Sequence, residues 1–178
     1  MDTQGEHTLL DYEIQFLIEE GKVIKGASTD RVQAVSYDCA LGLFYKRYDE
    51  EENTCPDDVI RMEASHAGPA KIEIGPGERV LLYTHEEFFI PSDMMLQATP
   101  RASWNRKGIS VDLSFVVEPG FEGPFCFPVT NKNSKTIEIS AQEAIISVTF
   151  HKLSNSVSRG WRERAPDALN RRKNKQDK

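Results

Sequence analysis

The sequence is poor in cysteine and contains no long hydrophobic run. Only three cysteines occur among 178 residues, Cys39, Cys55 and Cys126, and none belongs to a Cys-x-x-Cys pair. A disulfide framework requires paired cysteines and an oxidising compartment, so we expect reduced thiols. No apolar stretch approaches the length of a membrane-spanning helix, and no signal-like segment opens the chain. These absences predict a soluble, cytoplasmic protein with no membrane partner.

The sequence also lacks the excess of positive charge that binding to nucleic acid normally requires. It carries 22 basic and 28 acidic side chains, which gives a formal net charge of −6. We therefore expect no nucleic-acid partner, although a local basic pocket for a phosphorylated small molecule is compatible with this charge. His66, His85 and His151 are scattered without the spacing of metal ligands, so we expect no zinc site and no other metal held by protein side chains.

One domain with tails is expected from the length and from the hydrophobic pattern. Residues 1–8 are polar and predict a flexible N-terminus, whereas residues 9–153 predict the folded domain. Within it, residues 9–21 predict a short helix, because apolar residues recur at helical spacing and Gly21 suits the end. Basic residues outnumber acidic ones in residues 154–178, which predict a flexible tail or an arm that closes over an anionic ligand.

Short β-like runs separated by glycine, proline and asparagine fill the rest of the domain. This texture is typical of an all-β sandwich or jelly-roll rather than of alternating helices and strands. The expected strands are 71–74, 79–84, 88–90, 109–117, 125–129, 136–139 and 144–150.

Two runs could carry chemistry. Residues 100–108 place Arg101, Arg106 and Lys107 beside a hydroxyl and a glycine, which is a suitable set for binding phosphates. Residues 117–123 place Glu118 on a Pro-Gly turn followed by an aromatic ring, where a carboxylate can activate water and a ring can stack on a sugar or base. The ten residues 109–118 between the runs fit a β-hairpin arm, which would return Glu118 towards the basic run or present it to a neighbouring subunit.

These runs and four other segments resemble the superfamily of dCTP deaminases and dUTPases, over nearly the whole chain. Residues 101–108 are similar to its R-S-S-x-x-R-x-G motif and residues 118–123 to its D-P-G-F-x-G turn. The other matching segments, in order, are the N-terminal helix with residues 21–24, the S-x-D-x-x-L-G strand at 36–42, the P-G-E…T-x-E…P-x-D segment at 76–93, and Asn131 at the end of an L-F-N-like strand.

The resemblance implies a dUTPase-like β jelly-roll or barrel with a short N-terminal helix, assembled as a homotrimer with shared active sites. It also implies a deoxyribonucleoside triphosphate ligand, dCTP or dUTP, with magnesium carried on the phosphates and no zinc. Glu118 would be the catalytic carboxylate that activates water. The implied nucleotide-binding residues are Arg101, Ser103 and Arg106 for the triphosphate, the main chain around 113–117 with Ser114 for the pyrimidine, and Phe121 for the deoxyribose.

The chain departs from the deaminase pattern at the catalytic positions. Pro128 stands where the deaminases have the glutamate that acts as general base, and a proline side chain accepts no proton. Its missing N–H also predicts an edge or irregular strand. Ala102 replaces the first serine of R-S-S, and Ser147 replaces a glutamine of a later strand. Glu122 and Glu138 are the nearby acids that could substitute for the base, but neither has the required spacing.

Three functions remain open on the sequence alone. The first is deamination of dCTP to dUTP, favoured by the helix and the turn but opposed by Pro128 and Ala102. The second is hydrolysis of dUTP or dCTP through Glu118, which needs only one carboxylate together with cations and magnesium on the phosphates. The third is a non-catalytic nucleotide-binding or assembly protein that kept the fold. Cys126, between two phenylalanines, is expected to be buried, and Trp104 is expected to be a packing or trimer-contact residue.

Overall fold

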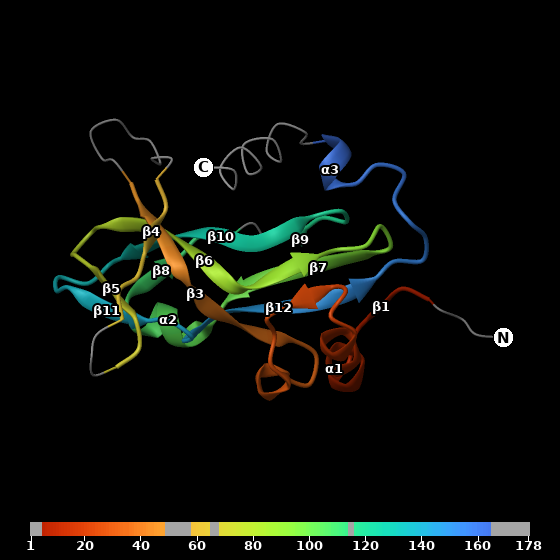
Figure 1. Ribbon diagram of the computed structural model, residues 1–178, viewed down its shortest axis with the longest axis horizontal. Coiled ribbons are helices and arrows are strands. Elements are labelled where there is room, and N and C mark those ends of the chain that lie inside the picture. Colours follow the sequence, from red (N-terminus) through yellow and green to blue (C-terminus); the bar gives the residue numbers. More distant parts are fainter. Residues whose placement is uncertain (1–4, 49–57, 65–67, 114–115, 165–178) are drawn as a thin grey trace.

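The computed structural model describes residues 5–48, 58–64, 68–113 and 116–164, and these form an all-β, jelly-roll-like fold with a few short helices (Figure 1). The helical elements are α1 (Asp11–Glu20), the 3-10 turn η1 (Thr29–Arg31), α2 (Ala102–Arg106) and α3 (Trp161–Arg164). The strands are β1 (His7–Thr8), β2 (Ile24–Lys25), β3 (Tyr37–Arg47), β4 (Ile60–Arg61), β5 (Lys71–Ile74), β6 (Arg79–Phe89), β7 (Met94–Pro100), β8 (Ile109–Val111), β9 (Val116–Val117), β10 (Glu122–Asn131), β11 (Ile137–Ser140) and β12 (Ala144–Lys152).

The strands form one large curled sheet and one small sheet, in which every described pair is antiparallel. The large sheet runs in the order β8-β10-β6-β3-β12-β7-β9, with β1 beside β12, β2 beside β6 and β4 beside β3. The small sheet pairs β11 with β5. Because β8 and β9 lie at opposite ends of the strand order but only a few residues apart in sequence, the sheet curls so that its two ends come close together. The all-β prediction is confirmed.

The N-terminal helix predicted at residues 9–21 is observed as α1. Ile14 is fully buried, and Leu17 and Ile18 pack partly against the same core. The Glu13 carboxylate accepts a hydrogen bond from the backbone N–H of Leu10 at 3.0 Å and so satisfies one of the free donors at the helix start. The helix ends at Gly21, whose left-handed φ of 61° suits glycine.

The long strand β6 joins two runs that the sequence analysis predicted as separate strands. Its side chains alternate strictly, and Val80, Leu82 and Phe88 point into the core. Burial of such apolar side chains contributes about 25 cal/mol for each Å² removed from water, so this alternation fixes which face of β6 is inside. Glu86 occupies a core position in the same alternation and is fully buried.

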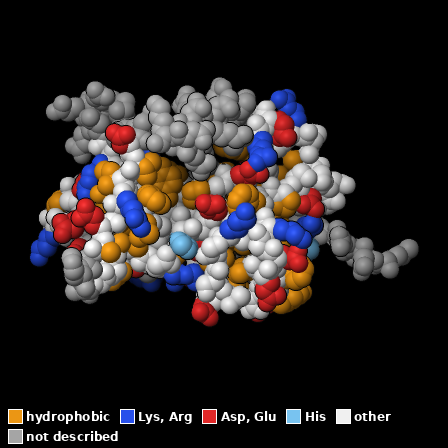
Figure 2. Space-filling view, in the orientation of Figure 1, with side chains coloured by type: hydrophobic (Ala, Val, Ile, Leu, Met, Phe, Trp, Pro, Cys, Tyr) orange, Lys and Arg blue, Asp and Glu red, His pale blue; other side chains and the backbone are white. Residues whose placement is uncertain are grey.

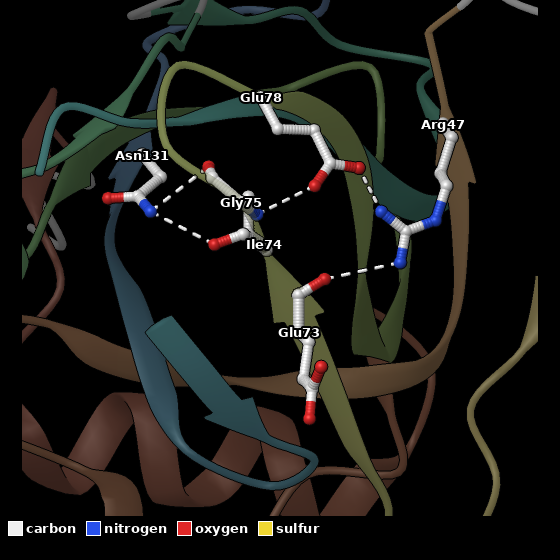
Figure 3. Close-up of polar contacts among 6 residues, drawn as sticks. All are labelled: Arg47, Glu73, Ile74, Gly75, Glu78 and Asn131. Carbon is white, nitrogen blue, oxygen red and sulfur yellow. Dashed lines mark hydrogen bonds and ion pairs between the residues drawn. The ribbon is translucent and has the colours of Figure 1, made fainter. Parts of the chain in front are cut away.

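A polar knot anchors the turn between β5 and β6 against the end of β10 (Figure 3). The side-chain nitrogen of Asn131 donates to the carbonyls of Ile74 at 2.9 Å and Gly75 at 3.0 Å, and also to Lys135 at 2.8 Å. Glu78 accepts a bond from the N–H of Gly75 and pairs with Arg47 of β3. Asn131 is fully buried, and the knot joins three strands far apart in sequence.

The structure corrects two expectations for this segment, a single strand at 109–117 and a β-hairpin arm at 109–118. Residues 109–111 form β8, which pairs with β10, whereas residues 116–117 form β9, which pairs with β7. β8 and β9 therefore do not pair with each other.

No helix within the described ranges is long and apolar enough to cross a membrane. Basic and acidic side chains intermix on the face that Figure 2 shows.

Candidate functional site

A cavity of about 420 Å³ opens beside the Glu118 turn. Its walls come from β7, β9, the turn at residues 118–121, β10 and α3. The lining residues are Ala98, Leu113, Val116, Val117, Glu118, Phe121, Phe125, Cys126 and Trp161. Glu118 is the one charged residue of this lining, so the cavity combines an apolar wall with a single carboxylate. Such a combination is typical of a small-molecule site.

Aromatic rings run from the core to the mouth of this cavity. Phe88 stacks on Phe125 with ring centroids 4.1 Å apart and an interplanar angle of 4°. Phe121 lies 5.3 Å from Phe125, and the ring of Trp161 meets Phe121 edge-on at 5.4 Å. Because the buried Phe88 supports the row, Phe121 offers a held aromatic surface against which a sugar or base can pack.

The turn that carries Glu118 is fixed by backbone bonds to the end of β6. The N–H of Gly120 donates to the carbonyl of Ile90 at 2.8 Å, and the N–H of Ile90 donates to the carbonyl of Phe121 at 2.9 Å. Gly120 has a φ of 83°, a left-handed conformation that glycine adopts without strain. The Pro-Gly sequence therefore sets Glu118 at the rim of the cavity, as its position on a turn predicted.

Two arginines of α3 neutralise the acids of this turn. Arg164 forms an ion pair with Glu118, and Arg162 forms one with Glu122. Both arginines belong to the run that the sequence predicts as a basic tail, and their charge alone does not indicate which acids they contact. Trp161 was likewise missed as a wall of the cavity. Residues 165–178 of that tail lie outside the described residues.

The predicted phosphate ligands do not line this cavity. Arg101 forms an ion pair with the buried carboxylate of Asp38, which also accepts a hydrogen bond from the Ser147 hydroxyl. Ser103 and Arg106 lie on α2, where Arg106 is exposed. Figure 1 places α2 in the left half of the molecule and α3 in the right half, so one chain holds its basic run apart from its cavity. Ser114 lies outside the described residues.

Trp104 of the basic run and Ser147 of β12 have structural partners. Trp104 is buried and donates from its indole nitrogen to the carbonyl of Ala144 at 2.8 Å, which confirms its packing role. Lys107 lies over its ring at 4.6 Å from the centroid. Ser147, in place of the family glutamine, reaches Asp38 and thereby joins β12 to β3.

Pro128 lies within β10, opposite Leu81 of β6. Its carbonyl accepts a hydrogen bond from the N–H of Asp112 at 2.9 Å, on the side of β8. Because the N–H and C=O of a strand residue point the same way, the donor that proline lacks would face Asp112, which continues the register of β8 beyond Val111. The proline therefore lacks the second hydrogen bond of this pair, and the β8 ladder ends beside it. The predicted edge or irregular strand is not found at Pro128, because β10 lies between β8 and β6 and its irregular register falls between Pro124 and Cys126.

The acids considered as replacements for the missing base have other partners. Glu122 pairs with Arg162, and Glu138 pairs with Lys71 on the small sheet away from the cavity. Cys126 was expected to be buried, and this expectation is wrong, because its side chain is exposed and lines the cavity. The buried cysteine of the described residues is Cys39 instead, and burial raises the pKa of its thiol.

Glu86, in the T-x-E motif, is a buried acid beneath the sheet rather than a cavity residue. Its carboxylate accepts hydrogen bonds from the hydroxyl of Tyr37 at 2.9 Å and from the N–H of Ala40 at 3.0 Å. Burial raises the pKa of Glu86, and these two donors oppose the rise. No group of three His, Cys, Asp or Glu side chains in the described part of the chain could hold a metal ion.

Comparisons with known proteins support this fold and match the sequence to a family. The sequence model of the dCTP deaminase-like family matches residues 8–153. A dUMP-forming dCTP deaminase of Methanothermobacter thermautotrophicus is 25% identical over 163 residues, covering 86% of this chain and 83% of that protein. A dUMP-forming dCTP deaminase of Dictyoglomus thermophilum is 28% identical over 167 residues, covering 88% of this chain and 86% of that protein.

Among solved structures, the 2′-deoxycytidine 5′-triphosphate deaminase of Agrobacterium tumefaciens matches with a TM-score of 0.66 and 18% identity. The match covers 84% of this chain but only 50% of that one, so this chain spans about half the length of the solved protein. At this identity the likeness supports the fold alone.

Proposed function

The chain belongs to the dCTP deaminase-like family, and we propose that it binds a pyrimidine deoxyribonucleoside triphosphate and hydrolyses it through Glu118. The observation that carries this proposal is that Glu118 is the single carboxylate of an otherwise apolar cavity with an aromatic wall. The reaction then needs one general base, and Glu118 is the one group of the cavity lining that can accept a proton from water.

In this mechanism the deoxyribose packs on Phe121 and Glu118 removes a proton from a water molecule. The water oxygen bonds to the α-phosphorus, the bond from that phosphorus to the bridging oxygen breaks, and pyrophosphate leaves. Magnesium would enter on the phosphates and neutralise their charge, a role that requires no dedicated cluster of protein ligands. The products from dUTP are dUMP and pyrophosphate.

The cations for the triphosphate are best supplied by another copy of the chain. Arg106 is exposed on α2, apart from the cavity of its own chain, and Ser103 lies on the same short helix. We therefore expect a homotrimer in which α2 of one subunit faces the cavity of the next. The mass of the protein in solution, measured by light scattering, tests this assembly.

Deamination is the weaker alternative because the cavity offers no second acid for it. Pro128 cannot accept a proton, and neither Glu122 nor Glu138 lines the cavity. A non-catalytic nucleotide-binding protein is favoured by a different observation, the ion pair that occupies Glu118. It predicts nucleotide binding without any product.

Measurement of pyrophosphate and ammonia released from dUTP and dCTP with magnesium separates these functions. Hydrolysis predicts pyrophosphate from the wild type and a loss of about 10²-fold or more in Glu118→Gln, since general bases contribute about 10²–10⁴-fold. Glu138→Gln is the matched control, because it removes an exposed, ion-paired glutamate from the small sheet.

Binding is followed separately by the rise in melting temperature with nucleotide, because a ligand of the native state stabilises it by mass action. A nucleotide-dependent rise without product would favour the non-catalytic function, and ammonia release would favour deamination. Full hydrolysis by Glu118→Gln would exclude the role proposed for Glu118. Arg106→Ala is the variant that tests phosphate contacts, because Arg101 has a structural ion pair that its removal would break.

A further inference from the structure

Residues 160–164, here called the strap, contact every residue of the turn 118–122. Arg164 pairs with Glu118 and Arg162 pairs with Glu122. Between these pairs, the N–H of Trp161 donates to the carbonyl of Pro119 at 2.7 Å, and its ring meets Phe121. The strap therefore covers the turn with alternating charged, backbone and aromatic contacts.

Two glycines make the close approach possible. A Cβ at Gly160 would lie 2.9 Å from the carbonyl oxygen of Pro119 and 3.5 Å from the Cα of Gly120. A Cβ at Gly120 would lie 3.2 Å from the backbone nitrogen of Trp161. Gly160 is itself buried, and its N–H donates to the Glu163 carboxylate at 2.7 Å. The sequence is thus adapted to dock the strap on this turn.

We propose that the strap is an autoinhibitory element that holds Glu118 in an ion pair, so that Glu118 activates water only after Arg164 has left it. The Arg164 guanidinium donates to one oxygen of the Glu118 carboxylate and thereby occupies a position from which that oxygen would accept a proton from water. The requirement for release rests on the proposed function of Glu118, whereas the docking of the strap does not.

The nucleotide itself can release the strap. A triphosphate carries more negative charge than Glu118 and offers bidentate acceptors to a guanidinium, so it competes with Glu118 for Arg164. Both ion pairs are about half exposed, with 48% of the Arg164 side chain and 40% of the Glu118 side chain accessible. Such pairs are weak and screened by salt, so a modest competitor opens them.

Acrylamide quenching of tryptophan fluorescence tests the docking without any nucleotide. The chain contains two tryptophans, and Trp104 is only 2% exposed, so added quenching reports on Trp161. We expect Arg164→Gln, Arg162→Gln and high salt each to increase quenching by about two- to fivefold. Gly160→Val acts on the backbone contact and should have the same effect. Arg159→Gln, which removes a charge from the adjoining residue, should leave quenching unchanged.

Turnover of dUTP by the same variants then tests inhibition. Arg164→Gln should hydrolyse dUTP faster than the wild type, by about the factor seen in quenching, and Arg159→Gln should match the wild type. Unchanged quenching in every variant would overturn the docking, whatever the turnover. Increased quenching with slower turnover would overturn the inhibition and make the strap part of the site. Increased quenching with no binding or turnover of nucleotide by any variant would support the docking and sink the proposed function instead.

Discussion

Arg101 of the basic run forms an ion pair with Asp38 of β3. The first cation of the phosphate motif therefore neutralises a buried acid and does not line the cavity of its own chain. Asp38 is 7% exposed and also accepts a bond from Ser147. This polar cluster joins three segments that are far apart in the sequence and that contribute Asp38, Arg101 and Ser147. Its main consequence is for stability.

Arg101→Ala should therefore destabilise the fold. It would leave a buried carboxylate without its cation, a loss of about 2 kcal/mol once partial exposure of the guanidinium is considered. Urea unfolding measures the free energy directly. Arg106→Ala is the matched control, because it removes an exposed arginine five positions later and should change the stability by less than about 0.5 kcal/mol. Equal stability of the two variants would contradict the structural role of Arg101.

Asn131→Ala should be more costly still. The side-chain nitrogen bonds three backbone carbonyls in a fully buried setting, and alanine would leave all three without this donor. We expect a loss of about 3 kcal/mol in the free energy of unfolding. Ser92→Ala is the comparison, since its hydroxyl bonds only Ser156 on the surface. A loss below about 1 kcal/mol would mean that water replaces the amide in the knot.

Much of the fold was predictable because it follows from local periodicity. The alternation in 71–74 predicts β5, and the helical spacing around Ile14 predicts α1. The run 109–117 has the same local texture but divides between β8 and β9, because pairing with β10 and β7 is a long-range property. β7 was not among the strands expected from texture, and its buried Met94, Leu96 and Ala98 alternate with half-exposed neighbours.

The candidate site was predictable only in part, for the same reason. Glu118 and Phe121 adjoin one cavity, as a turn followed by an aromatic ring suggested. The partners of Glu118 and Arg101 could not be read from spacing, since Arg164 and Asp38 are distant in sequence. Two arginines after Gly-Trp show where positive charge lies in the sequence but not which acids it pairs with. The partners become clear only in the folded chain.

Stability should fall with rising pH through the ionisation of Glu86. Burial raises the pKa of Glu86 above its ordinary value of 4.5, so the folded state holds this proton at pH values where the unfolded state has lost it. The contribution of Glu86 to the free energy of unfolding is then fully present below about pH 4.5. It is lost as the pH rises through the pKa of the folded state.

Glu86→Gln removes the titrating proton but keeps one oxygen, equivalent to Oε1, that can accept from both Tyr37 and Ala40. The variant should therefore gain stability relative to the wild type as the pH rises from about 4.5 to 7. Urea unfolding of both proteins across this range measures the difference. A difference that stays constant, or that changes in the opposite direction, would contradict the raised pKa.

A glutamate at position 128 should create deaminase activity. Residues 126–130 pair regularly with β6, so side chains 126 and 128 share one face of β10, and Cys126 on that face lines the cavity. The new N–H at position 128 would face Asp112, whose own N–H already donates to the carbonyl of residue 128. We expect Pro128→Glu combined with Ala102→Ser to release ammonia from dCTP at a rate about 10²-fold or more above the wild type, the least that a positioned general base contributes. Pro128→Gln with the same Ala102→Ser is the matched control, since it has the shape of glutamate without the basic oxygen and should release none. If the glutamate variant binds dCTP as the control does and still releases no ammonia, then the loss of deamination in this chain has a cause other than Pro128.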